Sequence, residues 1–129
     1  MLTPRLATNN TGTVTWTWEG DAFGATLANE DVDGDLNLET INLRFPGQYA
    51  DVESGLSDNY FRHYDSGLGR YITSDPIGLQ GGLNTFGYVG GDPIYWSDKL
   101  GLASRSDTRR AWNIINTCFQ SLHFWCFII

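Results

Sequence analysis

Short units in which tyrosine precedes aspartate and Ser–Gly–Leu follows constrain the fold more than any other feature of this chain. QYADVESGL covers residues 48–56, and HYDSGL covers residues 63–68. Recurring units of this kind, rich in turn residues, indicate a β-repeat. Each unit is too small to bury its own apolar face, so it must stack on neighbouring units. We therefore expect a mostly β chain of hairpins and turns that forms the end of a longer repeat array.

Alternating residues predict where the strands lie. TVTWTW at residues 13–18 alternates threonine with apolar residues, which indicates a strand with one aromatic face. INLRF at 41–45 alternates in the same way and predicts a second strand. NYFRHYDSGLGRYITSD at 59–75 predicts two strands around a turn at 66–69. The 15 glycines and the 14% aromatic content also suit strands and tight turns better than a helical bundle.

The phrase Ser–Asp–x–x–Gly–Leu occurs twice, as SDPIGL at 74–79 and as SDKLGL at 97–102. Acidic residues outnumber basic residues up to this point, whereas residues 103–129 contain three arginines and one aspartate. A change in charge directly after the second copy indicates a boundary. We divide the chain into repeat strands (1–58), a motif-dense segment (59–102) and a variable tail.

The tail is predicted to be helical. Ser106 or Asp107 can cap a helix that has one apolar stripe. Residues 111–129 are uncharged, but their asparagine, glutamine and histidine side chains argue against a membrane span. Cys118 and Cys126 stand eight residues apart, too far for a disulfide along a helix. We expect a short α-helical tail that is a truncated toxin or a remnant.

Residues 61–102, FRHYDSGLGRYITSDPIGLQGGLNTFGYVGGDPIYWSDKLGL, resemble the core segment that closes RHS-repeat (YD-repeat) polymorphic toxins. TPRLATNNTGTVTWTWEGDAFG and INLRFPGQYADVESGL resemble the YD repeats that lead into that core. The resemblance implies a hollow β-shell that encloses a C-terminal toxin and is plugged at one end by the core. It implies upstream RHS repeats, secretion machinery and an immunity protein for the tail as partners, and it implies no cofactor.

The resemblance also implies a self-cleavage site. Many members of that family cut themselves directly after the second motif, using the aspartates of the two motifs and a nearby arginine. Carried over by position, the aspartates are Asp75 and Asp98, and the cut falls between Leu102 and Ala103. The arginine corresponds to Arg62 in FRHYD.

Two further residues bear on the assignment of this site. Arg70, in GRYITSDP, is a second candidate for the arginine. Lys99 departs from the family pattern, because proline usually follows the second aspartate. Proline would restrict the backbone of that turn, whereas lysine leaves it freer and adds a positive charge beside Asp98.

The chemistry of a carboxylate pair supports such a site. Two carboxylates held close together share a proton, because both cannot ionise comfortably. One can then activate water while the other protonates the amide product, and an arginine can orient a carboxylate or polarise the scissile carbonyl. On the alternative interpretation each motif is a turn whose aspartate accepts backbone N–H groups, and the chain is an inert structural shell end.

An acidic loop at 31–39 invites comparison with calcium-binding loops. Asp31, Asp33 and Asp35 match the first three ligand positions of an EF-hand-like loop. Leu36 stands where that loop needs glycine, and Asn42 stands where it needs a bidentate glutamate. We expect a solvated loop and no metal.

The abundant aromatic residues raise a third function, surface carbohydrate binding. Aromatic residues on alternating strands more often pack inside a shell, which is the favoured interpretation. The residues concerned are Trp16, Trp18, Tyr60, Phe61, Tyr64, Tyr71 and Tyr88.

Charge and targeting signals bear on partners and location. The formal net charge of −7 repels phosphate backbones, so nucleic acid is not an expected partner. The opening MLTPRLATNN lacks the apolar core of a secretory signal. We expect a secreted or cell-surface location as part of a full-length RHS protein, and a cytoplasmic one if the chain is expressed alone.

Overall fold

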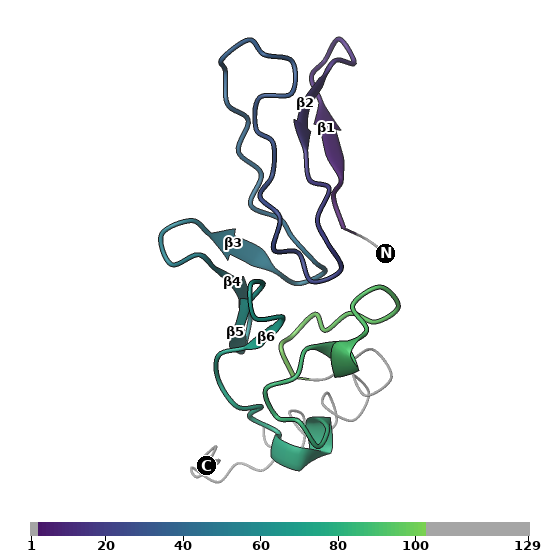
Figure 1. The fold of residues 1–129 in the computed structure, drawn as a ribbon, viewed down its shortest axis with the longest axis vertical. Coiled ribbons are helices and arrows are strands. Elements are labelled where there is room, and N and C mark those ends of the chain that lie inside the picture. The colour runs from purple at the N-terminus through teal and green to yellow at the C-terminus, as the bar shows by residue number, and fades with distance from the viewer. Residues whose placement is uncertain (1–2, 103–129) are drawn as a thin grey trace, which may run out of the picture.

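The computed structural model describes residues 3–102, and this part of the chain is mostly β. A two-stranded antiparallel sheet lies in one half and a four-stranded antiparallel sheet begins in the middle and runs into the other (Figure 1). The elements are β1 (Leu6–Thr8), β2 (Val14–Thr17), β3 (Tyr49–Asp51), β4 (Leu56–Asn59), β5 (Arg62–Asp65), β6 (Arg70–Tyr71) and the 3₁₀ turns η1 (Gly78–Gly81) and η2 (Val89–Gly91). The predicted helical tail lies outside the described residues.

The first hairpin confirms the strand predicted from TVTWTW. Strand β2 pairs with β1, with Ala7 opposite Trp16. The Asn9 side chain closes the turn, because its Oδ1 accepts the N–H groups of Thr11 and Thr13, each at 3.0 Å. Trp16 is fully buried, as the alternation requires, and Trp18 directly after β2 is buried too.

The second predicted strand, at 41–45, is not formed. In this segment only Leu43 makes a β-bridge, to Tyr49, and its side chain is 53% exposed. Two backbone hydrogen bonds flank this bridge, from Arg44 N–H to the Gln48 carbonyl and from Ala50 N–H to the Asn42 carbonyl, and the Arg44 guanidinium binds the carbonyls of Ile41 and Leu43. Of the alternating set, Phe45 is buried in the core and Ile41 packs against it.

Three consecutive hairpin connections build the four-stranded sheet in the order β3-β4-β5-β6. The two tyrosine–aspartate units supply β3 with its following turn and β5 with its following turn. Tyr64 pairs with Tyr71 and Asp65 with Arg70 across the β5–β6 turn. This hairpin was predicted from the sequence and is confirmed.

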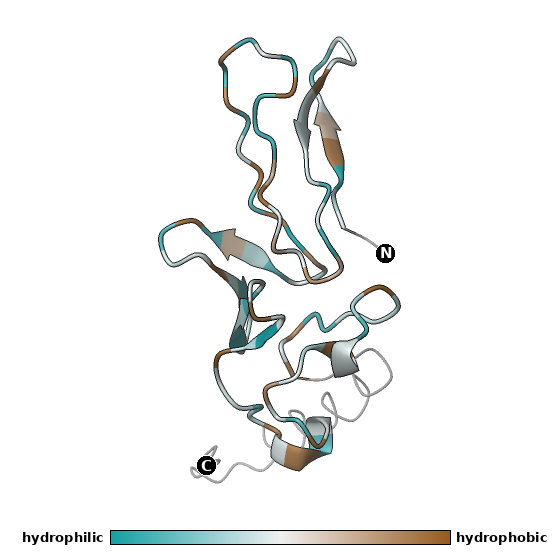
Figure 2. Ribbon diagram, in the orientation of Figure 1, coloured by the Kyte–Doolittle hydropathy of each residue, from teal (hydrophilic) through white to brown (hydrophobic). Residues whose placement is uncertain are grey.

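One aromatic cluster links the two halves of the molecule. Tyr88 contacts Phe45 at a ring-centroid distance of 6.0 Å and Tyr64 at 4.6 Å, and Phe45 contacts Trp18 at 5.6 Å. Burying each such side chain contributes roughly 1.5–3 kcal/mol. Figure 2 shows short apolar and polar stretches alternating along the ribbon, as expected of small units that share one core. The cluster consists of Trp16, Trp18, Phe45, Tyr64, Tyr71, Tyr88 and Val89.

Within residues 3–102 no helix is long and apolar enough to cross a membrane. The segment 111–129, for which the sequence argued against a span, lies outside the described residues.

Candidate active site

The two Ser–Asp–x–x–Gly–Leu motifs fold as turns organised by their aspartates. Asp75 Oδ1 accepts the N–H of Ile77 at 2.9 Å. Asp98 Oδ1 accepts the N–H groups of Leu100 at 3.3 Å and of Leu102 at 3.1 Å. These bonds agree with the interpretation of the motifs as turns, but they involve only Oδ1 of each carboxylate. The Oδ2 atoms make a different contact.

Arg62 joins the two aspartates. It is the first residue of β5, its side chain is buried, and its Nη2 lies 3.1 Å from Asp75 Oδ2 and 3.3 Å from Asp98 Oδ2. Its Nη1 donates to the carbonyl of Thr85 at 3.1 Å, and its Nε donates to the carbonyl of Gly101. The structure therefore brings together the two predicted aspartates and the first predicted arginine.

The second candidate arginine is placed differently. Arg70 has an exposed side chain that lies over the ring of Phe86, 5.9 Å from its centroid. Arg62, not Arg70, is thus the arginine that bridges the carboxylates.

Burial acts on the ionisation of Asp75. Asp75 is 7% exposed, and the loss of solvent raises the pKa of its carboxyl group above the ordinary value. The Ile77 N–H and the Arg62 guanidinium oppose this rise in pKa, while the charge of Asp98 adds to it. The surroundings of Asp75 therefore favour its protonated form more than water does.

Leu102 is the residue held at the pair. Its side chain is 2% exposed and packs against Ile77 and Leu100, which occupy the same position in the two motifs. The corresponding leucine of the first motif, Leu79, is 71% exposed. The two copies of the motif therefore differ in the structure, because only the leucine of the second copy lies at the aspartates.

Gly81, at the end of η1, faces the carboxyl group of Asp75 and the carbonyl of Leu102. A Cβ atom at this position would lie 2.9 Å from Leu102 O and 3.1 Å from Asp75 Cγ, and it would collide with Asp75 Oδ2. A cavity of about 740 Å³ opens here, lined in part by Arg62, Asp75 and Asp98. Water therefore has room beside the Leu102 carbonyl.

Lys99 leaves the carboxylate pair intact. Its side chain is exposed. Its backbone lies against Gly47, where a Cβ atom would come within 2.7 Å of Lys99 C. Ala103, on the other side of the predicted cut, lies outside the described residues.

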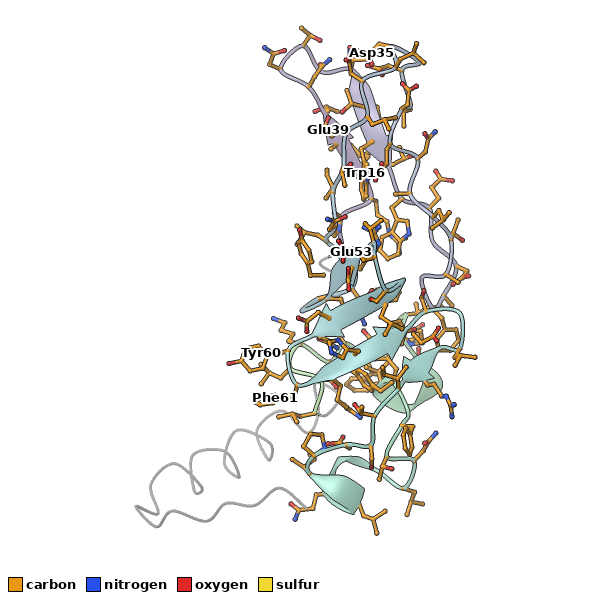
Figure 3. The ribbon with its side chains drawn as sticks, turned by 90° about the vertical axis from the view of Figure 1, so that its left-hand side faces the viewer. Trp16, Asp35, Glu39, Glu53, Tyr60 and Phe61 are labelled. Atoms are coloured by element: carbon orange, nitrogen blue, oxygen red, sulfur yellow. The ribbon has the colours of Figure 1, made fainter. Side chains whose placement is uncertain are left out.

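The acidic loop lies far from this site, at the opposite end of the molecule (Figure 3). Carboxylate oxygens of Asp31, Asp33 and Asp35 lie within 4.8 Å of one another, and Leu36 has a φ of 66°. Three carboxylate oxygens are fewer than the six to eight oxygen ligands that calcium takes.

The aromatic residues lie mostly in the core rather than on a binding surface. Trp16, Trp18, Tyr64, Tyr71 and Tyr88 are almost completely buried. Of the set considered for sugar binding, Tyr60 and Phe61 remain exposed, and they project from the side of the sheet (Figure 3). Their rings pack edge to face at 4.7 Å. A carbohydrate platform built on the two tryptophans is therefore wrong.

Sequence reasoning missed several residues around the aspartates. Asn59 and Tyr71 contact Asp98 directly, and Gly81 shapes the space beside Asp75. Tyr71 was noticed as a strand aromatic, but no local pattern marks Asn59 or Gly81 as neighbours of the motifs. Their roles depend on contacts between distant parts of the chain.

The fold and the site together define a class of protein: a β-hairpin array closed by two aspartate turns that meet on one buried arginine. No profile of a known protein family matches the chain. The chain is 43% identical over 101 residues to the double-stranded DNA deaminase toxin A of Burkholderia cenocepacia, covering 78% of this chain and 7% of that protein. It is 40% identical, with the same two coverages, to the probable deoxyribonuclease RhsA of Dickeya dadantii.

A third relative is the toxin protein Tse5 of Pseudomonas aeruginosa, 47% identical over 60 residues, which cover 46% of this chain and 5% of Tse5. Among solved structures, TcdB2-TccC3 without its hypervariable C-terminal region aligns with a TM-score of 0.65 and 28% identity. That match covers 78% of this chain and 5% of the other. The chain belongs to the RHS-repeat polymorphic toxins and contains their core segment.

Proposed function

We propose that the chain is the C-terminal shell end of an RHS-type toxin-delivery protein and that it cuts itself once, after Leu102. The observation that carries this proposal is the bridge from Arg62 to both Asp75 and Asp98 beside the buried Leu102. The names of the relatives support a toxin context. The solved TccC3 that lacks a hypervariable C-terminal region supports a variable segment beyond the core.

In the proposed reaction a water molecule from the cavity adds to the carbonyl carbon of Leu102. Asp98 takes a proton from that water, which would replace one of the four donors on its carboxylate. Asp75, whose pKa is raised by burial, stabilises the developing oxyanion and then delivers its proton to the nitrogen of Ala103. The C–N bond breaks, and the products are a carboxylate at Leu102 and a free amine at Ala103.

Arg62 orients the two carboxylates in this reaction. Its Nε contacts the carbonyl of Gly101, one residue before the scissile carbonyl, so its role is to hold the backbone and the carboxylates rather than to polarise the Leu102 carbonyl. The rate should fall as the pH rises through the pKa of Asp75, because the acid then loses its proton.

The test is a time course of the full 129-residue chain, followed by mass spectrometry for a new N-terminus at Ala103. Asp75→Asn and Asp98→Asn should each abolish cleavage. Asp58→Asn, an exposed aspartate on β4, is the matched control and should cut like the unsubstituted chain. An intact chain, with the Lys99→Pro variant also intact, would leave the inert shell end as the function.

The remaining expectations follow from the same proposal. The chain would act as part of a longer secreted RHS protein whose upstream repeats complete the shell. An immunity protein would neutralise the released segment in the producing cell.

A further inference from the structure

The carboxylate of Asp98 receives four hydrogen bonds, two on each oxygen. Oδ1 accepts the N–H groups of Leu100 and Leu102. Oδ2 accepts Arg62 Nη2 at 3.3 Å and the hydroxyl of Tyr71 at 2.9 Å. Hydrogen bonds to the charged form favour ionisation. Of these donors, Tyr71 alone comes neither from the second motif nor from the predicted catalytic set.

The direction of the Tyr71 hydroxyl is determined by Asn59, at the end of β4. Asn59 Nδ2 lies 2.9 Å from the backbone carbonyl of Asp98 and 2.6 Å from Tyr71 Oη. A carbonyl can only accept, so the amide nitrogen must face it, and the same nitrogen donates to the tyrosine oxygen. The tyrosine proton is then free to point at Asp98 Oδ2. Both side chains are fully buried, so water does not compete with this arrangement.

Tyr71 contacts the arginine as well. The guanidinium carbon of Arg62 lies 3.6 Å from the centroid of the Tyr71 ring. Tyr71 of β6 therefore stacks on Arg62 through its ring and donates to Asp98 through its hydroxyl.

We propose that Asn59 and Tyr71 are positioning residues for self-cleavage, which hold the Asp98 carboxylate aligned with Leu102. This inference rests on the self-cleavage function proposed above. Desolvation first, and then the charge of Asp98, raise the pKa of Tyr71, so its hydroxyl stays protonated and remains a donor. The other titratable groups that face Asp98 are Arg62, Asp75 and Tyr88.

The substitution Tyr71→Phe isolates the hydroxyl, because the ring remains available to stack on Arg62. We expect cleavage to slow by about tenfold to a hundredfold, the range for losing one hydrogen bond to a charged group.

Tyr64→Phe is the matched control. Tyr64 is equally buried and packs against Tyr71, but its hydroxyl donates to the carbonyl of Phe23 at 2.8 Å. It should leave the cleavage rate unchanged, even if it lowers the thermal stability of the chain.

A second measurement does not depend on cleavage. The chemical shift of the Asp98 carboxyl carbon, measured by NMR, should change in Tyr71→Phe and not in Tyr64→Phe, because only Tyr71 donates to that carboxylate. In the unsubstituted chain, the Tyr71 hydroxyl proton should exchange slowly with water and show contacts with the Asn59 amide.

The outcomes separate the two proposals. An uncut chain whose Asp98 carboxyl signal still depends on the Tyr71 hydroxyl would rule out self-cleavage and keep the positioning contact. Normal cleavage with an unchanged Asp98 signal in Tyr71→Phe would overturn the positioning role and leave self-cleavage standing. Slower cleavage with an unchanged Asp98 signal would reduce Tyr71 to a packing residue. If Tyr71→Phe fails to fold, rapid exchange of the hydroxyl proton in the unsubstituted chain would overturn the inference.

Discussion

Gly81→Ala adds one methyl group at the point where Asp75 and Leu102 face each other. The backbone at Gly81 does not have the positive φ that would require glycine. The added Cβ would nevertheless lie 2.9 Å from the Leu102 carbonyl oxygen and overlap Asp75 Oδ2. Ordinary contacts of a Cβ atom begin at about 3.4 Å, so the carboxyl group or the scissile carbonyl has to move. Overpacking of this kind costs roughly 1–3 kcal/mol of stability.

The effect on cleavage should exceed the effect on stability. Displacing a reacting group by about 1 Å can cost about a hundredfold in rate, so we expect Gly81→Ala to cut at least that much more slowly. The assay is the time course of the Ala103 N-terminus by mass spectrometry, with thermal unfolding measured in parallel.

Gly87→Ala is the control for this prediction. Gly87 also lines the cavity and has no positive φ, but a Cβ there meets Asn84, at 3.2 Å, and not the aspartates. Gly81→Ala that cuts at the rate of the unsubstituted chain would refute the placement of Asp75 beside the Leu102 carbonyl.

Four further predictions concern stability and the second motif. Burial raises the pKa of Asp75, so its contribution to stability is complete below about pH 3.8 and is lost as the pH rises through its pKa in the folded chain. The melting temperature of Asp75→Asn should therefore rise relative to that of the parent chain between pH 3 and pH 7. Asp21→Asn should show the opposite trend, because backbone N–H groups, led by that of Ala25, lower the pKa of Asp21. Lys99→Pro should change the cleavage rate by less than about threefold, since the Lys99 side chain is exposed; a large gain in the same time course would mean that lysine impairs the site. Gly47→Ala should lower stability by roughly 1–3 kcal/mol in chemical denaturation and slow cleavage, because glycine there has a φ of 92° and lies against the Lys99 backbone.

Local patterns were sufficient for the β5–β6 hairpin and for the two aspartates of the site. Tyrosine, aspartate and glycine at short spacing predict the β5–β6 turn, since turn chemistry depends on neighbours in sequence. The doubled motif marked Asp75 and Asp98, and family resemblance marked Arg62, and all three lie together in the structure. What these residues do remains a prediction.

Other features depend on distant contacts that no local pattern encodes. The alternation in INLRF is as regular as that in TVTWTW, yet it forms only one isolated β-bridge. Leu79 and Leu102 are equivalent in their motifs, and only tertiary packing decides that one is exposed and the other is buried. Gly81 faces Leu102, 21 positions further on, and Asn59 binds Asp98, 39 positions further on.

The burial of Leu102 has a consequence for what happens after a cut. The new chain end would place a third carboxylate beside Asp75 and Asp98, with Arg62 as the one guanidinium that bridges them. Charge repulsion would push this end out, while the packing of the leucine side chain against Ile77 and Leu100 would hold it in. As long as packing prevails, the proposed protease would remain blocked by its own product. Its own chain end would occupy the site before and after the cut, so no other polypeptide could enter it.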